Sequence, residues 1–256
     1  MSVFSTFAKD KVYLLGVVPQ FGPQKLHEIW LPIIHELEVK TGYKFRLVGD
    51  PTIPAFEKEF MKGKFDFAYM NPYHIVEANR KQGYIPLVRD HGRKLFGILT
   101  VRMDSRIKSV MQLHGKKIAF PSPNALGASL LMRADLINHF KIDFEPVYAK
   151  THTSTYYNVA LGLVDAGGGV MGTLNRQKKE IKDRLRVLYE TKRVSPHPFA
   201  AHPRVPKKVR EAVRNAFLKI NQKLLVKVPF KKIGSSNLKD HQELATWGLE
   251  KLYVSE

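Results

Sequence analysis

Short apolar segments alternate with amphipathic helical segments along most of the chain, and this alternation limits the possible folds more than any other feature. The segments "KVYLLGVVP" (11–19) and "KFRLVGD" (44–50) have the length and composition of strands. The segment between them, "QKLHEIWLPIIHELEVKTG" (24–42), has helical periodicity and ends in a glycine, which is typical of a helix C-terminus. Strands that alternate with helices predict the α/β class, with a largely parallel sheet covered by helices.

The alternating pattern runs to about residue 102 and then starts again at "KKIAFPS" (116–122). A chain of 256 residues is long enough for two lobes of roughly 100–130 residues, each with its own core. The final part of the chain reads as mostly helical. We therefore predict two α/β lobes and a helical tail, with extended chain crossings at residues 98–104 and 190–197.

The composition and the motifs argue against an enzyme. The chain has no cysteine, which excludes disulfides, thiolate catalysis and cysteine metal sites. It also lacks the phosphate-binding loop of nucleotide hydrolases, the dinucleotide-binding glycine pattern, the paired histidines of zinc proteases and the serine hydrolase elbow. His197 and His202 offer a possible metal pair, but prolines flank both, which favours an extended crossing. We predict no cofactor and no metal.

The sequence leaves the compartment open. No segment approaches the roughly 18–20 apolar residues of a membrane span. The opening "MSVFSTFAKDK" has no basic region followed by an apolar one, as a secretory signal would. Two interpretations follow: a cytosolic protein, or an exported protein whose signal has been removed.

The net charge of +19 is concentrated late in the chain. Residues 204–232 contain ten Lys or Arg and one acidic residue, Glu211. Such a run is compatible with binding to nucleic acid or an anionic membrane. However, "PKKVREAVRNAFLKINQKLL" (206–225) has one apolar face, formed by Val209, Val213, Ala216, Phe217 and Ile220. We favour an amphipathic helix with a solvated basic face, which attracts anions over long range.

Three strand-to-helix junctions carry the candidate binding residues. In open α/β sheets, ligands bind beyond the carboxyl ends of strands, where helix N-termini present unpaired N–H groups to anions. The junctions are "AYMNPY" (68–73), "PSPNALGAS" (121–129) and "THTSTYY" (151–157). The candidate side chains and backbone positions are Tyr69, Asn71, Tyr73, Asn124, Ala125, Leu126, Gly127, His152, Thr153 and Ser154.

Each junction also has a purely structural interpretation. Asn71, Asn124 and Ser154 have the residue types of helix N-caps, which need no ligand. Tyr69, Tyr73 and His152 fit ordinary packing positions. The glycines of "DAGGGVM" (165–171) indicate either a backbone that a ligand approaches closely or a strand packed tightly against a helix.

Four segments together resemble a known family. "GVVPQFGPQKLHEIWLPIIHELEVKTGYKFRLV", "GKFDFAYMNPYHIVEA", "GKKIAFPSPNALGASLL" and "THTSTYYNVALGLVDAGGGV" are similar to successive signatures of the phosphate, phosphite and phosphonate-binding proteins of bacterial ABC transporters. The resemblance extends from about residue 12 to about residue 210. It implies a type II periplasmic-binding-protein fold, with residues 1–102 and 197–256 in lobe 1 and residues 103–196 in lobe 2, closing on a ligand at a hinge.

Position by position, the resemblance also implies changes in the ligand site. The family cradle usually reads Pro-x-Ser-Thr-Ser-Gly, and the matching stretch here is "PNALGA" (123–128), so hydroxyls are missing at positions 125–127. The family histidine matches His152, with Ser154 close by. Val170 and Met171 stand where the family often has an acidic residue. Each lost hydrogen bond to a charged group is worth roughly 1.5–3 kcal/mol, so the preferred ligand is expected to differ.

The resulting hypothesis is an extracytoplasmic receptor of an ABC importer, periplasmic or tethered to the membrane. It would be a monomer that captures a small anion, either phosphonate-like, phosphate-like or organic, and delivers it to a permease. A first alternative is the ligand-sensing domain, or the soluble partner, of a membrane receptor kinase. A second alternative is a nucleic-acid binder that uses the basic helix, but the sequence shows no interleaved aromatic platform, so no nucleic-acid partner is predicted.

Overall fold

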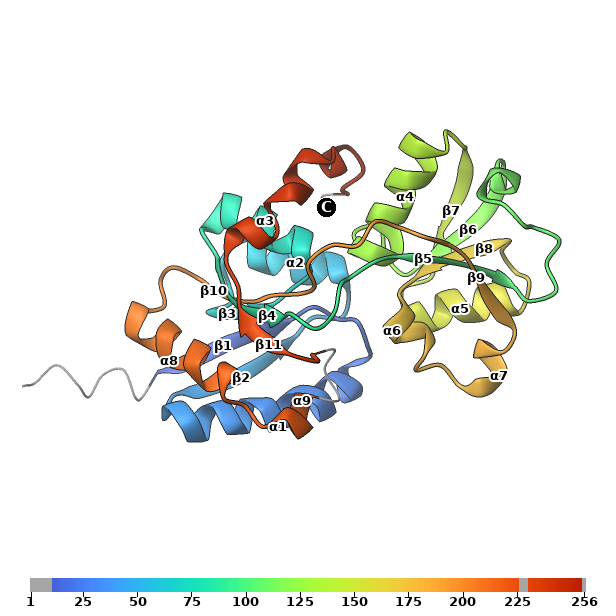
Figure 1. Ribbon diagram of the computed structural model, residues 1–256. Coiled ribbons are helices and arrows are strands. Elements are labelled where there is room, and N and C mark those ends of the chain that lie inside the picture. Colours follow the sequence, from blue (N-terminus) through green and yellow to red (C-terminus); the bar gives the residue numbers. More distant parts are fainter. Residues whose placement is uncertain (1–10, 226–229, 255–256) are drawn as a thin grey trace, which may run out of the picture. The chain divides into compact units, whose positions relative to one another are not determined.

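The computed structural model describes residues 11–225 and 230–254, and its chain divides into two compact units (Figure 1). The first unit takes in the described residues up to Lys94 together with Ser195–Leu244. The second takes in Leu95–Val194 and the described residues from Ala245 onward. The predicted division differs in two respects: the unit boundaries fall earlier than 102/103 and 196/197, and the segment after Leu244 groups with the second unit. The chain therefore passes between the units three times, where two crossings were expected.

The first unit is built on a six-stranded mixed sheet. Its strand order is β11-β4-β10-β3-β1-β2. The strands are β1 (Val12–Val17), β2 (Lys44–Gly49), β3 (Phe67–Tyr69), β4 (Ile85–Asp90), β10 (Phe199–Ala201) and β11 (Ile233–Ser235). β1 runs parallel to β2 and β3, and β10 runs antiparallel to both β3 and β4. The carboxyl ends of β1 to β4 therefore share one edge, which we call the carboxyl edge of the first sheet.

Helices pack around the first sheet because each presents an apolar stripe. They are α1 (Pro23–Thr41), α2 (Ile53–Met61), α3 (Pro72–Gln82), α8 (Lys207–Leu218) and α9 (Gln222–Leu225), with short 3₁₀ helices at Leu238–Asp240 and Gln242–Thr246. α1 shows the local rules: it has proline at its first position, and Gly42 ends it at φ 71°. Its buried face consists of Leu26, Ile29, Trp30, Ile33, Ile34 and Leu37.

The second unit has a five-stranded mixed sheet with the order β7-β6-β8-β5-β9. The strands are β5 (Ile98–Arg102), β6 (Lys116–Phe120), β7 (Phe144–Tyr148), β8 (Ala166–Gly169) and β9 (Leu185–Glu190). β6 runs parallel to β7 and β8, so the carboxyl ends of these three strands share an edge, the carboxyl edge of the second sheet. β5 pairs antiparallel with β8 and β9, so residues expected to form a crossing instead form an interior strand.

A continuous helical stretch, Leu126–His139, follows β6. It comprises π-helical turns at Leu126–Leu131 and Asp135–His139 around α4 (Met132–Ala134). The remaining helices are α5 (His152–Ala160), α6 (Met171–Leu174) and α7 (Lys179–Lys182), with 3₁₀ turns at Val110–Leu113 and Leu249–Lys251. Alternation along β6 supplies the core on both sheet faces: Ile118 and Phe120 join one apolar cluster and Ala119 joins the other.

Candidate functional site

The ten predicted site residues fall into two groups. Seven lie in the second unit, in the turns that follow β6 and β7, and three lie in the first unit after β3. Because β6 and β7 are neighbouring parallel strands, the seven residues of the second unit share the carboxyl edge of its sheet. The sequence prediction therefore places them correctly at one edge within that unit. Whether they bind a ligand is a separate question.

The turn after β6 presents backbone donors. Ala125 is the N-cap of the helical stretch, with φ −64° and ψ 101°, and no side chain caps it. The first N–H groups of a helix have no intrahelical partner, and they carry the positive end of the helix dipole. The backbone at Leu126 and Gly127 is thus the part of this turn suited to an oxyanion. In the same turn the Ser122 hydroxyl is buried and has no hydrogen-bond partner among the described residues.

Asn124 does not serve as the N-cap that its residue type indicated. Its side-chain oxygen accepts a hydrogen bond from the Val254 N–H (3.0 Å), and its amide group donates to the Val254 carbonyl (2.8 Å). Arg133 adds two contacts, since its guanidinium donates to the carbonyls of Leu252 (2.8 Å) and Pro123 (2.9 Å). Two buried polar side chains therefore tie the segment near residue 254 to the turn after β6.

The glycine strand β8 serves packing, the second of its two interpretations. A Cβ atom built at Gly168 would lie 1.9 Å from the Ala128 carbonyl oxygen, and one at Gly169 would lie 2.1 Å from the Tyr156 hydroxyl oxygen. At Gly167 the nearest atom, 2.6 Å away, belongs to Val159. The absence of side chains on β8 lets the start of the helical stretch and α5 approach the sheet closely. The glycines thus position the turn after β6.

His152 belongs to a buried polar network at the start of α5. Its Nδ1 lies 3.3 Å from the Thr173 hydroxyl, which in turn lies 2.8 Å from the Tyr156 hydroxyl. The Tyr156 hydroxyl accepts the Val170 N–H at 3.1 Å. The Thr173 hydroxyl also lies 2.9 Å from the Val170 carbonyl, to which it can donate its one proton. In the tautomer in which Nδ1 accepts from Thr173, the other ring nitrogen of His152 carries the N–H and can donate to an oxyanion.

Burial sets the charge of this network. Loss of hydration lowers the pKa of His152 to about 4, so its ring is neutral at pH 7. The same effect raises the pKa of Tyr156 to about 12, which keeps its hydroxyl protonated. Near pH 7, the start of α5 therefore presents a neutral imidazole and not a histidine cation.

The start of α5 is capped by Thr151, and not by Ser154 as one interpretation had it. The Thr151 hydroxyl oxygen accepts the Ser154 N–H at 3.0 Å and lies 2.9 Å from the Ser154 hydroxyl. Thr153 is exposed, and the Gln177 side chain reaches its hydroxyl at 3.4 Å. Of the three predicted residues here, only His152 is buried.

In the first unit, Asn71 is an N-cap. Its side-chain oxygen accepts the N–H groups of Tyr73 (2.9 Å) and His74 (2.8 Å) at the start of α3. Tyr69, at the end of β3, is buried beside Trp30, with ring centroids 4.9 Å apart, and stacks on His197 at 5.4 Å. Tyr73 is also buried. The structural interpretation thus holds for the Asn71 cap, and the aromatic residues form a rigid group at the carboxyl edge.

A comparison with known families identifies the chain. A family model described as the periplasmic substrate-binding protein of phosphonate ABC transporters matches residues 15–243. The chain belongs to this family. No curated protein matches the chain at a significant level. The family binds and transports substrates and is not a class of enzymes, and the resemblance seen in the sequence is confirmed.

Solved structures confirm the fold of this binding protein. A binding component of a phosphonate ABC transporter from Pseudomonas aeruginosa is similar, with a TM-score of 0.80, 17% identity and coverage of 94% of this chain and 86% of that one. PhnD1 from Prochlorococcus marinus, solved with methylphosphonate, gives a TM-score of 0.85 at 15% identity, over 95% and 99% of the two chains. A sulfonate-binding protein from Methylobacillus flagellatus is more distant (TM-score 0.56, 19% identity, 96% and 75%). The predicted architecture, two mixed sheets flanked by helices, is therefore confirmed.

The sequence analysis of this binding protein did not consider Gln20, and it considered His197 only as part of a metal pair. Gln20 follows β1, and its side-chain nitrogen lies 3.0 Å from His197 Nε2. His197 lies two residues before β10, whose first residue pairs with Tyr69 at the end of β3. Both residues therefore lie at the carboxyl edge. The rule that located Tyr69 also applies to the turn after β1, and it identifies Gln20 there.

The possible metal pair of His197 and His202 is not formed. The two residues flank β10 at opposite ends: His197 stacks on Tyr69, whereas the His202 N–H donates to the Asp66 carbonyl at 2.9 Å. Within residues 11–225 and 230–254, no group of three or more His, Asp or Glu side chains is arranged to hold a metal ion. Among the same residues, no helix has the length and hydropathy needed to cross a membrane.

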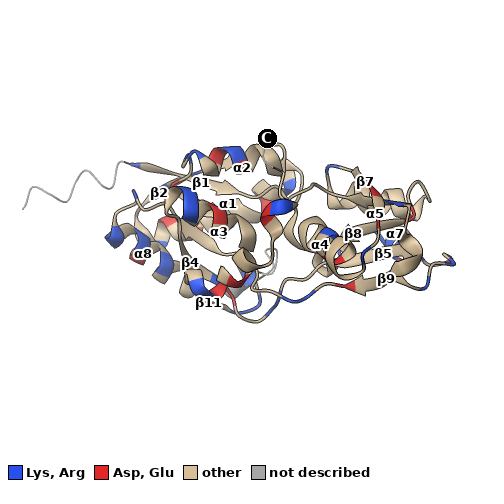
Figure 2. Cartoon of the chain, turned by 90° about the horizontal axis from the view of Figure 1, so that it is seen from above, with Lys and Arg blue, Asp and Glu red and all other residues tan. Residues whose placement is uncertain are grey.

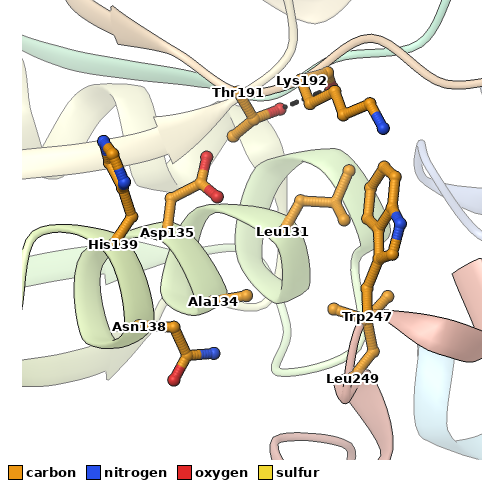
Figure 3. A pocket seen from close by; sticks show the side chains of 9 residues that line it. All are labelled: Leu131, Ala134, Asp135, Asn138, His139, Thr191, Lys192, Trp247 and Leu249. Carbon is orange, nitrogen blue, oxygen red and sulfur yellow. Dashed lines mark hydrogen bonds between the residues drawn. The ribbon is translucent and has the colours of Figure 1, made fainter.

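The second unit also contains a separate cavity of about 440 Å³ (Figure 3). Figure 3 shows Asp135 and His139 on the helical stretch, with Trp247 on the opposite wall. The Lys192 ammonium lies 4.4 Å from the Trp247 ring centroid, and Tyr189 donates to Asp135 at 2.9 Å. The chain near Trp247 thus forms one wall of this cavity, in addition to its contact with Asn124.

The role of Asn124 can be tested directly. We expect Asn124→Ala to release the segment around Val254, because the substitution removes two hydrogen bonds that are worth about 1 kcal/mol each. Hydrogen exchange at the Val254 amide should accelerate at least tenfold. The Trp247 side chain should become more mobile, which lowers its fluorescence anisotropy. If Asn124 instead contacts only the ligand, the substitution will weaken ligand binding and leave exchange at Val254 unchanged.

Proposed function

We propose that this chain is an extracytoplasmic receptor for a small oxyanion of the phosphonate class, which it delivers to the permease of an ABC importer. Membership of the phosphonate-binding family supports the transport role, the periplasmic location and the permease partner. The neutral His152 ring, held by Thr173 beside two helix N-termini, carries the proposal of an oxyanion. The receptor acts as a monomer.

The ligand of the Prochlorococcus marinus relative suggests the first compound to try, methylphosphonate. Isothermal titration against phosphate, phosphite, methylphosphonate, 2-aminoethylphosphonate and methanesulfonate tests the proposal. We expect an unsubstituted or alkyl oxyanion to bind more tightly than the aminoalkyl compound. The reason is that Val170 and Met171 provide no carboxylate for an ammonium group. Absence of binding by every compound would contradict the proposed ligand class.

Substitution of His152 tests the site. We expect His152→Ala to weaken binding of the best compound by about 10- to 100-fold, which corresponds to the roughly 1.5–3 kcal/mol of a hydrogen bond to a charged group. Tyr69→Phe, which removes one hydroxyl in the first unit, should weaken binding of the same compound by about fivefold. Thr153→Ala is the matched control, because Thr153 is exposed and we expect no effect.

If Tyr69→Phe weakens binding and His152→Ala does not, the ligand does not bind at the candidate residues of the second unit. Circular dichroism of each variant separates lost binding from lost folding. Light scattering with size-exclusion chromatography checks the proposed monomer.

A further inference from the structure

Four exposed cations gather at one end of β4 and β11. They are Arg93, Lys94, Lys231 and Lys232, and we call them the cationic rim. The two loops that carry them are side by side: a Cβ atom built at Gly92 would lie 2.8 Å from the Lys231 Cβ. Figure 2 shows that basic residues also lie along α8. The rim differs from these residues because it lies just beyond the paired ends of β4 and β11.

Asp90 builds the rim from beneath. Its carboxylate is 1% exposed and accepts three backbone N–H groups, from Gly92 (2.8 Å), Lys231 (2.8 Å) and Lys232 (2.9 Å). The Arg93 side chain also approaches this carboxylate, with its Nε 3.9 Å away. One buried anion therefore fixes the backbone of both loops and leaves the lysine ammonium groups outside.

The lysines of the rim are not neutralised. Within the part of the chain that the structure describes, no carboxylate pairs with Lys94, Lys231 or Lys232. The next acidic residue along the chain after Lys232, Asp240, is paired with Arg89 at 3.0 Å. The rim thus combines four cations and one buried carboxylate, and its field extends into solvent.

The rim lies at the carboxyl edge of the first sheet. β4 ends at Asp90 and runs in the same direction as β3, which ends at Tyr69, with one strand between them. Phe199 pairs with both Tyr69 and Val88, and Asp90 lies two residues beyond Val88. With strands about 4.8 Å apart and a rise of about 3.3 Å per residue, the two ends are separated by about 12 Å. The Debye length at physiological ionic strength is about 8 Å. The field of the rim therefore reaches the Tyr69 end of the edge, weakened but not abolished by salt.

We propose that the cationic rim of Arg93, Lys94, Lys231 and Lys232 is an electrostatic guide that concentrates anionic solutes at the carboxyl edge of the first sheet. The inference deepens the proposed function, on which it rests, because it assigns a role in capture to residues outside the binding groups. Flexible lysines without fixed partners suit long-range attraction better than recognition of one ligand shape. Such attraction raises association rates by 10- to 1,000-fold and declines steeply with salt.

The sharpest test needs no knowledge of the ligand. Paramagnetic relaxation of the backbone amides in residues 20–22, just after β1, is measured by NMR with an anionic and with a neutral gadolinium chelate. We expect the anionic-to-neutral ratio to fall at least threefold in the double variant Lys231→Glu/Lys232→Glu. The matched control is Lys207→Glu/Lys208→Glu, which makes the same change in net charge at the start of α8. α8 follows the far end of β10, at the opposite edge of the sheet.

The guide is overturned if the two variants lower the ratio equally, because net charge alone would then explain it, or if neither changes it. Stopped-flow binding of methylphosphonate gives a second readout. We expect the rim variant to lose at least tenfold in association rate at 10 mM NaCl, with the difference vanishing at 500 mM and the dissociation rate unchanged. An increase confined to the dissociation rate would make the lysines ligand contacts instead. If the wild-type chain binds no methylphosphonate, the proposed ligand fails, while the chelate measurement still decides the role of the rim.

Discussion

Replacing Gly168 by alanine should lower the free energy of unfolding of the second unit by about 3 kcal/mol and abolish oxyanion binding. The added methyl carbon would lie 1.9 Å from the Ala128 carbonyl oxygen and 2.7 Å from the Phe120 ring. The first neighbour is backbone, which cannot rotate away, so the cost falls at the upper end of the usual range for an overpacked core. The helical stretch would shift, and the turn around Asn124 and Gly127 would shift with it.

Gly172 provides a matched control four residues later. Nothing lies within 4 Å of a Cβ atom built there, so Gly172→Ala should leave stability unchanged or raise it slightly. Urea denaturation can be followed in each unit by its single tryptophan, Trp30 in the first unit and Trp247 in the second, when the other tryptophan is replaced by phenylalanine in every variant compared. Equal unfolding midpoints of the Trp247 signal in the two variants would show that β8 does not need its glycine at 168.

Acidification should destabilise both units between about pH 6.5 and pH 4, by about 3 kcal/mol each. Burial lowers the pKa of His152 in the second unit to about 4, and that of His241 in the first unit to about 4. The unfolded chain takes up these protons near pH 6.5, whereas the folded chain resists them to about pH 4. The stabilising contribution is therefore complete above pH 6.5 and is lost as the pH falls, at 1.36 kcal/mol per pH unit.

The variants His152→Gln and His241→Gln separate the two contributions. Each should flatten the pH dependence of the tryptophan signal of its own unit and leave that of the other unchanged. Carboxylates whose pKa is lowered, such as Asp240 at about 2, act only below about pH 4, so they do not obscure this range. Half-buried carboxyls with a raised pKa, including Asp50 and Asp135, oppose the effect equally in wild type and variants. Parallel curves for wild type and both variants would contradict the assignment.

The periodicity of the sequence predicted the fold well, and local rules explain why. Alternating strand and helix segments, and the Gly42 helix end, depend on neighbours in the chain. The unit boundaries were less predictable. β5 is a short apolar segment whose role as an interior strand depends on pairing with β8 and β9, far along the chain. The position of the segment after Leu244 depends on side chains more than 100 residues away.

The candidate site was predictable in location and less so in role. The rule of carboxyl ends placed His152 and the turn at 121–127 at one edge of the second sheet. It did not show that the Asn124 side chain hydrogen-bonds to the Val254 backbone, or that Thr151 caps α5. The reason is that residue type indicates a helix cap only in a general way. Gln20 was missed for the opposite reason: the rule applied to it, but the turn after β1 has no residue type that stands out.

The contact between Asn124 and Val254 has a consequence for how the chain is made. The two residues are 130 positions apart, and the second segment of the first unit is synthesised in between. At bacterial rates this interval lasts on the order of ten seconds. During it, the nascent second unit lacks one wall of its cavity and the partners of two buried polar groups. The contacts of Asn124 and Arg133 with residues 252–254 can therefore form only after both segments of the first unit have been made.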